Sequence, residues 1–271
     1  MISASTPGPL NPGNVVSAAL RMYRDRFKMY FGLSARAVLW ALVPVYGWAQ
    51  YGMHTGLMSR LAFQELVNQP ETARDAERAI KPKMWSFLWL GLLLVAIFIS
   101  TYIGVAIVAV LLGILVGGLL GTALAAIFGD GGAVFSGIVV GLITFLGIIL
   151  GLLWVVSRVF ISEVSLAMES RVGASDSIGR SWQLTKGSIM RIQFVVLAAY
   201  LVTLPVIIVT FLPQLAQLRM EPGTAAYNLV TLVSLVISLA FNIAVLPFWQ
   251  VVKGVLYYDL RSRREGLDLS M

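Results

Sequence analysis

The feature that most constrains this chain is the run Met84–Phe128, which contains no charged residue. As one helix it would be about 68 Å long at 1.5 Å per residue, whereas the hydrocarbon core of a bilayer is about 30 Å thick. A soluble core could not cover so much apolar surface. We therefore expect an integral α-helical membrane protein. We prefer two spans in this run, with a turn near Gly113–Gly121, over one long bent helix.

The composition leaves no room for a separate soluble domain. The chain is 58% hydrophobic and 12% charged, whereas soluble domains carry about 25% charged residues. The longest polar stretch, residues 55–83, is too short and too charged to form its own core. We expect a single membrane domain over residues 14–260. It is flanked by a flexible tail, residues 1–13, which lacks a cleavable signal pattern, and by a basic tail, residues 261–271.

Apolar segments elsewhere predict an all-α, polytopic transmembrane bundle of about six spans. A turn at Gly129–Gly132 separates the third and fourth spans. Arg36 and Pro44 interrupt the first segment, which could instead form a re-entrant hairpin. The segments outside 84–128 are Leu33–Tyr51, Ala133–Val156, Ile189–Leu212 and Thr224–Val252.

Lysine and arginine gather in residues 21–28, 158–191 and 253–264. Because cytoplasmic flanks carry the excess of these residues, both termini and the 158–191 region are expected in the cytoplasm. Six spans then place residues 55–83 outside. If 84–128 is one helix, parity requires a re-entrant hairpin at Leu33–Tyr51 and places 55–83 inside.

Two segments have the pattern of interfacial helices. Residues 14–31 alternate apolar and basic positions at helical spacing, which is typical of a helix lying in the membrane plane; a polar lead-in to the first span is the alternative. Residues 162–188 form the second segment. With a net charge of +7, both segments predict contact with anionic lipid headgroups. The residues expected at the headgroups are Arg21, Arg24, Arg26, Lys28, Trp182 and Lys186.

Glycines recur at the four-residue spacing that lets helix backbones approach closely. This spacing predicts helix–helix contacts, either within one chain or between chains of a homo-oligomer. The glycines concerned are Gly113, Gly117, Gly121, Gly137, Gly141, Gly147 and Gly151.

The residue types needed for chemistry are scarce. There is no cysteine and one histidine, His54, so thiolate sites and multi-histidine zinc sites are excluded. The spans after residue 83 contain no acidic residue, which weighs against ion coupling. Arg36, Arg158 and Glu163 are interpreted as charges at the membrane edge. We expect no catalytic residue, no metal, no cofactor and no nucleic-acid partner.

Glu169 followed by Arg180-Ser181-Trp182-Gln183-Leu184-Thr185-Lys186-Gly187 resembles the E…RSW-x-L-T-x-G signature of a bacterial and archaeal membrane family. That family is named after the membrane domain of some glycerophosphoryl diester phosphodiesterases. The stretches Val15–Phe27 and Tyr257–Arg261 with Glu265–Asp268 resemble its opening and its closing YYDLR…EG-x-D motif. The resemblance implies a six-span bundle of unknown role in a prokaryotic plasma (inner) membrane. The chain has no room for the catalytic barrel, so no such activity is implied.

The signature residues also predict a polar cluster, because Glu169, Arg180, Asp259 and Arg261 fall on the same expected cytoplasmic side. Such a cluster would lock the cytoplasmic face together. The favoured function is a non-enzymatic protein that scaffolds, organises or shapes membrane, as a homo-oligomer. A transporter or channel-like conduit for a lipid or other amphiphile is the alternative, and an intramembrane enzyme is the third hypothesis.

Overall fold

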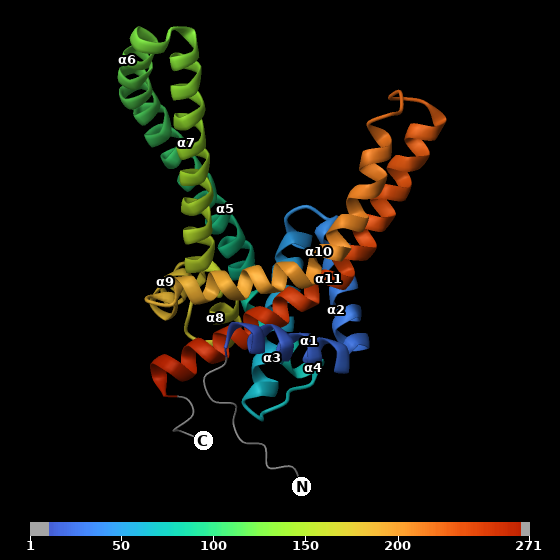
Figure 1. Ribbon diagram of the computed structural model, residues 1–271. Coiled ribbons are helices and arrows are strands. Elements are labelled where there is room, and N and C mark those ends of the chain that lie inside the picture. Colours follow the sequence, from blue (N-terminus) through green and yellow to red (C-terminus); the bar gives the residue numbers. More distant parts are fainter. Residues whose placement is uncertain (1–10, 267–271) are drawn as a thin grey trace. The chain divides into compact units, whose positions relative to one another are not determined.

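The computed structural model describes residues 11–266, apart from the side chain of Val116, and this part of the chain contains helices and no strands (Figure 1). The long apolar helices follow from the rule that backbone groups in lipid must be hydrogen-bonded within their own segment. The helices are α1 Pro12–Asp25, α2 Phe27–Ala41, α3 Tyr46–Leu66, α4 Ala73–Ile80, the 3₁₀ turn η1 Lys81–Lys83, α5 Met84–Leu112, the π-helical η2 Gly113–Gly117, α6 Gly118–Phe128, α7 Asp130–Val159, α8 Ser162–Met168, α9 Ala174–Thr185, α10 Ile189–Gln217 and α11 Ala225–Glu265.

Four helical runs in the described residues are long and apolar enough to cross a membrane, and six spans are not confirmed. The turn predicted near Gly113–Gly121 is wrong, because α5, η2 and α6 form one continuous helix. Its glycines stay helical, and a π-helical segment at their start takes up the irregularity. The helix ends at Gly129, whose φ of 62° lies in the left-handed region that glycine adopts readily.

Contacts divide the chain into two compact units, of which residues 92–159 form the smaller. This unit is a helical hairpin in which α6 and η2 pack against α7. The side chains of Val140 and Ser136 lie against Gly117 and Gly121 across the hairpin. The remaining apolar surface of the hairpin is largely exposed, as a lipid-facing surface would be.

The larger unit, residues 1–91 and 160–271, contains a densely packed part that we call the base. The base comprises α1 to α4, α8, α9 and the second half of α11, and α11 packs against α3, α10, α1 and α2. Figure 1 shows α10 and α11 running through the base before they turn away from it as a hairpin. α11 has two characters, because residues 229–236 expose large apolar side chains whereas Pro247 to Leu260 are mostly buried.

The expected single helix at residues 14–31 is wrong, because the chain breaks at Arg26 into α1 and α2. α1 buries Val15, Val16 and Ala19 in the base. The Tyr23 hydroxyl donates to the Ala244 carbonyl at 2.7 Å, close to where Pro247 removes a backbone donor from α11. α1 is therefore amphipathic, and it is also held against α11 by a hydrogen bond.

The bounds predicted for the two terminal tails also differ from the structure. Residues 261–265 are not a tail but the last turn and a half of α11, which Gly266 closes in the left-handed conformation. Pro12 and Gly13 belong to α1 instead of the flexible tail. The rest of the two predicted tails, residues 1–10 and 267–271, lies outside the described residues.

Candidate functional site

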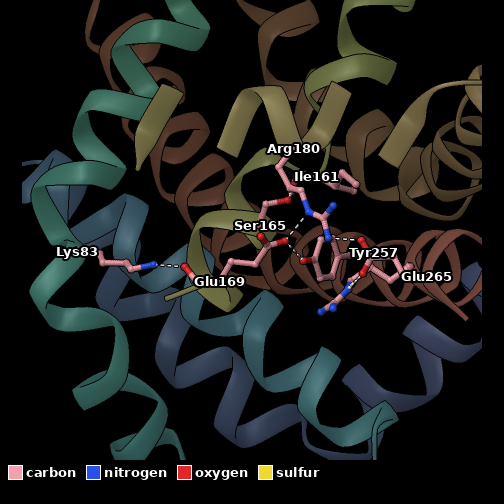
Figure 2. Close-up of polar contacts among 8 residues, drawn as sticks. Lys83, Ile161, Ser165, Glu169, Arg180, Tyr257 and Glu265 are labelled. Carbon is pink, nitrogen blue, oxygen red and sulfur yellow. Dashed lines mark hydrogen bonds and ion pairs between the residues drawn. The ribbon is translucent and has the colours of Figure 1, made fainter. Parts of the chain in front are cut away.

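The largest set of linked polar side chains surrounds Glu169, the residue at which α8 ends. Figure 2 shows the Glu169 carboxylate between two donors. Arg180 Nε of α9 donates to it at 2.8 Å, and the Tyr257 hydroxyl of α11 donates at 2.9 Å. Lys83 Nζ donates to the Glu169 backbone carbonyl. Glu169 thus joins η1, α8, α9 and α11.

Glu265, at the end of α11, extends this set. It accepts from Arg180 Nη2 and, at 2.8 Å, from Arg261 Nε. Burial by itself would lower the pKa of Arg180, but its hydrogen bonds to Glu169 and Glu265 outweigh burial and raise the pKa. The result is an alternating chain of acid and base, Glu169–Arg180–Glu265–Arg261, in which each charge has an opposite neighbour.

Asp259 belongs to a separate group of three charged side chains. Its carboxylate accepts from Arg191 of α10 at 3.0 Å and from Arg263 at 3.2 Å, and its side chain is 1% exposed. Of the four residues predicted to cluster, the structure thus links Glu169, Arg180 and Arg261 through Glu265, while Asp259 ties α11 to α10. The sequence analysis missed Glu265 and Tyr257 as members, although both lie in the closing motif.

A third set joins the polar segment 55–83 to α8. Arg60 donates to both carboxylate oxygens of Glu71, at 2.8 and 2.7 Å, and to the Ala167 carbonyl at 2.9 Å. The Arg60 hydrogen bond lowers the pKa of Glu71. Lys83 also donates to the Leu166 carbonyl at 3.1 Å. Residues 60 to 83 and residues 166 to 169 therefore lie on the same side of any membrane that this protein crosses.

The membrane-edge charges behave differently from one another. Glu163 binds Lys253 of α11, 90 positions further along the chain, at 2.6 Å. Arg36 is exposed on α2. His54 is buried, and its Nδ1 lies 2.8 Å from the Gln50 carbonyl of its own helix.

The residues expected at headgroups are mostly at the surface. Arg21, Arg24, Lys28 and Lys186 are exposed, and Trp182 is 39% exposed. Arg26 instead pairs with Glu65 of α3 at 3.4 Å, because the break between α1 and α2 turns it towards the base.

The glycines separate into two groups. A Cβ added at Gly113, Gly117, Gly121 or Gly151 would lie within 4 Å of a side chain of the other helix of the hairpin. At Gly151, for example, it would lie 3.2 Å from the side chain of Val105. Gly137, Gly141 and Gly147 have no such neighbour within 4 Å. The first group packs the hairpin together; of the second, Gly137 and Gly141 lie four residues apart on α7, and Gly147 lines a groove between α5 and α7.

The base has the chemistry of a structural lock. Its strongest contacts are charge-assisted pairs between elements distant in sequence, and such pairs hold geometry by multiple oriented bonds. Among the described residues no group of three or more metal-binding side chains occurs. No protein-family model, curated protein or solved structure matches this chain. The class that the fold and site define is a helical protein with four potential membrane spans and an ion-paired base.

Proposed function

We propose that this chain is a multi-pass membrane protein that scaffolds or shapes the bilayer, with an ion-paired base and with apolar helical hairpins. The observation that carries the proposal is the contrast between the two kinds of surface. The best apolar window of the α4–α6 run has a mean hydropathy of 2.8, and none of it is buried within the chain. In contrast, ion pairs in the larger unit join four helices, α8, α9, α10 and α11.

Four spans with both termini cytoplasmic fit this arrangement better than six. A six-span topology would put Arg60 and Ala167 on opposite sides of the membrane, yet they share a hydrogen bond of 2.9 Å. Of the loops that join the paired spans, that at residue 129 has no basic residue and that at 218–224 has only Arg219. The positive-inside rule then favours a cytoplasmic base.

A sidedness experiment tests this topology. Because the chain has no cysteine, single cysteines can be introduced at Arg78 in α4, at Arg171 between α8 and α9, and at Arg219 at a hairpin tip. We expect a membrane-impermeant maleimide to label positions 78 and 171 from one side and position 219 from the other. Labelling of 78 and 171 from opposite sides would restore the six-span topology.

Gly137 and Gly141 support self-association as part of this function, since small residues four positions apart let a second helix approach. The test compares Gly137→Leu/Gly141→Leu with a control, Gly104→Leu, at another glycine with open surroundings. We expect the double variant to lower the mass of the complex in mild detergent and the control to leave it unchanged. A wild-type protein that is strictly monomeric, and that leaves liposome shape unaltered, would refute the scaffold proposal.

A conduit for a lipid or other amphiphile is the second candidate, favoured by an apolar groove of about 320 Å³ between α5 and α7. The groove is lined by Ala109, Ile143 and Thr144, among others. Ala109→Phe would fill it, whereas Val110→Phe changes an outward position that is 60% exposed. Transport of a fluorescent phospholipid across reconstituted liposomes that is lost in the first variant alone would support a conduit over a scaffold.

We retain membership of the phosphodiesterase-linked membrane family, and residence in a prokaryotic plasma membrane, as proposals. The motif Glu169…Arg180-Ser181-Trp182 supports them, because the structure gives its charged residues paired roles. If the signature preserves this pairing, exchanging the charges (Glu169→Arg with Arg180→Glu) should recover more of the protein's thermal stability than either single change.

A further inference from the structure

The turn between α2 and α3 has an unusual composition for a turn in water. Residues 42–45 are Leu-Val-Pro-Val, without the glycine, asparagine, aspartate or serine that water-exposed turns favour. Leu42 is 68% exposed, Val43 44% and Val45 53%. α2 and α3 pack along each other as a hairpin, so these side chains are presented at its tip.

Several polar groups near the tip are hydrogen-bonded within the chain, which lowers their cost in hydrocarbon. The Tyr46 N–H donates to the Pro44 carbonyl at 2.8 Å, and Pro44 itself has no N–H to satisfy. The Trp48 indole reaches back to the Ala41 carbonyl at 3.2 Å. These contacts remove polar groups from the end of the hairpin that a turn in water would leave to solvent.

The tip also holds a strained residue. Val45 has a φ of 61°, a left-handed conformation that is rare for a β-branched residue. Glycine would relieve the strain, and because Val45 is 53% exposed it would lose only part of the packing of one side chain. Valine at this position indicates that its apolar side chain is used by something outside the chain.

Aromatic rings mark the depth of the tip. The ring centroids of Trp40 and Tyr46 lie 5.5 Å apart, and those of Tyr46 and Trp85 lie 6.4 Å apart. Trp85 is the second residue of α5 and follows the last charge, Lys83, before the long uncharged run. Tryptophan and tyrosine concentrate where headgroups meet acyl chains, so the tip lies where α5 enters the membrane.

Charge supports the same placement. Exposed Arg36 lies on α2 below the tip, and exposed Lys28 lies at the other end of that helix. Cations on the flank of an inserted apolar element complement the phosphates of an anionic leaflet. An apolar tip, an aromatic level and a cationic flank follow each other along one helix.

We propose that the α2–α3 hairpin is a re-entrant element whose tip, Leu42–Val45, inserts into the acyl chains of the leaflet next to the base. Arg36 then lies among the phosphates and the hairpin returns without crossing. The inference rests on the proposed membrane function and adds to it a wedge that enlarges one leaflet only. Unequal insertion of this kind is the means by which a scaffold would bend a bilayer.

The test uses nitroxide spin labels on single cysteines of the full-length chain in phosphatidylglycerol–phosphatidylcholine vesicles. The tip is labelled at Val43→Cys, with Leu42→Cys as a second tip variant in case the first does not fold. Leu232→Cys, on the exposed face of a span, is the reference for lipid, and Arg78→Cys, in α4, is the reference for water. Collision with dissolved oxygen and with a water-soluble nickel chelate reports depth.

We expect the tip label to lose nickel accessibility relative to position 78 and to gain oxygen accessibility, at a depth shallower than position 232. A tip label as accessible to nickel as position 78, with position 232 in lipid, overturns the re-entrant hairpin alone. A label at 232 that is itself in water overturns the membrane function as well. A tip label as deep as 232 would instead indicate a span.

Discussion

Replacing Asp259 by asparagine tests whether the ion pairs of the base are structural. The substitution keeps the size of the side chain but removes its charge. Asp259 is 1% exposed and accepts from Arg191 and Arg263. Asparagine is uncharged and carries an NH2 donor in place of one acceptor oxygen, so both ion pairs are lost and fewer hydrogen bonds to the two arginines remain. The Nε atom of Arg191 is already buried without a hydrogen bond, which leaves this guanidinium few alternatives.

The magnitude follows from the exposure of the partners. Removing one member of a fully buried pair costs about 3–5 kcal/mol. Arg191 and Arg263 are 20% and 35% exposed, so water recovers part of this, and we expect a loss of about 2–3 kcal/mol. For a unit of roughly 200 residues, this corresponds to a fall in melting temperature of roughly 4–12 °C.

The assay is thermal unfolding in mild detergent, followed by tryptophan fluorescence at one fixed heating rate, because such transitions are often irreversible. The matched control is Asp25→Asn, which removes the acid of the exposed Arg24–Asp25 pair, 76% and 63% exposed. Exposed pairs contribute little, so the control should melt like the wild type. Equal melting of the Asp259 and Asp25 variants would refute the assignment of a structural role to the buried pair.

Three further predictions concern other parts of the base. The pKa of Glu71 is lowered from 4.5 in the folded protein by its hydrogen bond from Arg60. The stabilisation that the ionised Glu71 contributes is therefore complete above pH 4.5 and is lost as the pH falls through the folded pKa. Glu71→Gln should thus flatten the acid side of the curve of stability against pH, measured by fluorescence. Gly254→Ala would place a Cβ 2.6 Å from a backbone oxygen of α3 and should cost about 1–3 kcal/mol, whereas Gly32→Ala, with open space around it, should stabilise by up to about 1 kcal/mol in the same melting assay. Tyr23→Phe should lose about 1 kcal/mol with its hydrogen bond to α11, and an unchanged melting temperature would show that this bond does not fasten α1.

The sequence predicted the positions of several helices and turns well, but not how the long apolar run is divided. It placed the 45-residue apolar run, the turn at residue 129 and the amphipathic α9 within a few positions, because hydropathy and glycine–aspartate turns are local signals. It divided Met84–Phe128 wrongly, since glycine in lipid does not by itself end a helix. Length compared with bilayer thickness favoured two spans, whereas α5, η2 and α6 form one continuous helix.

The polar contacts were foreseen only in part. The sequence could place Glu169 and Arg180 on one side of the membrane, but not show that Tyr257 and Glu265 complete their contacts. Glu163 illustrates the difficulty, because its partner Lys253 is 90 positions away whereas Arg158 is close in sequence.

By itself the sequence determined that this protein is helical, has apolar runs long enough to cross a bilayer and concentrates its charges outside those runs. Those properties follow from the composition of the chain and from the spacing of its apolar residues, both of which can be read along the sequence. Only the tertiary structure decided which charges pair, which glycines pack the α6–α7 hairpin and which face outward, and that residues 60–83 share a side with α8. These depend on distances between segments far apart in the chain, and such distances are fixed by packing, not by any local pattern.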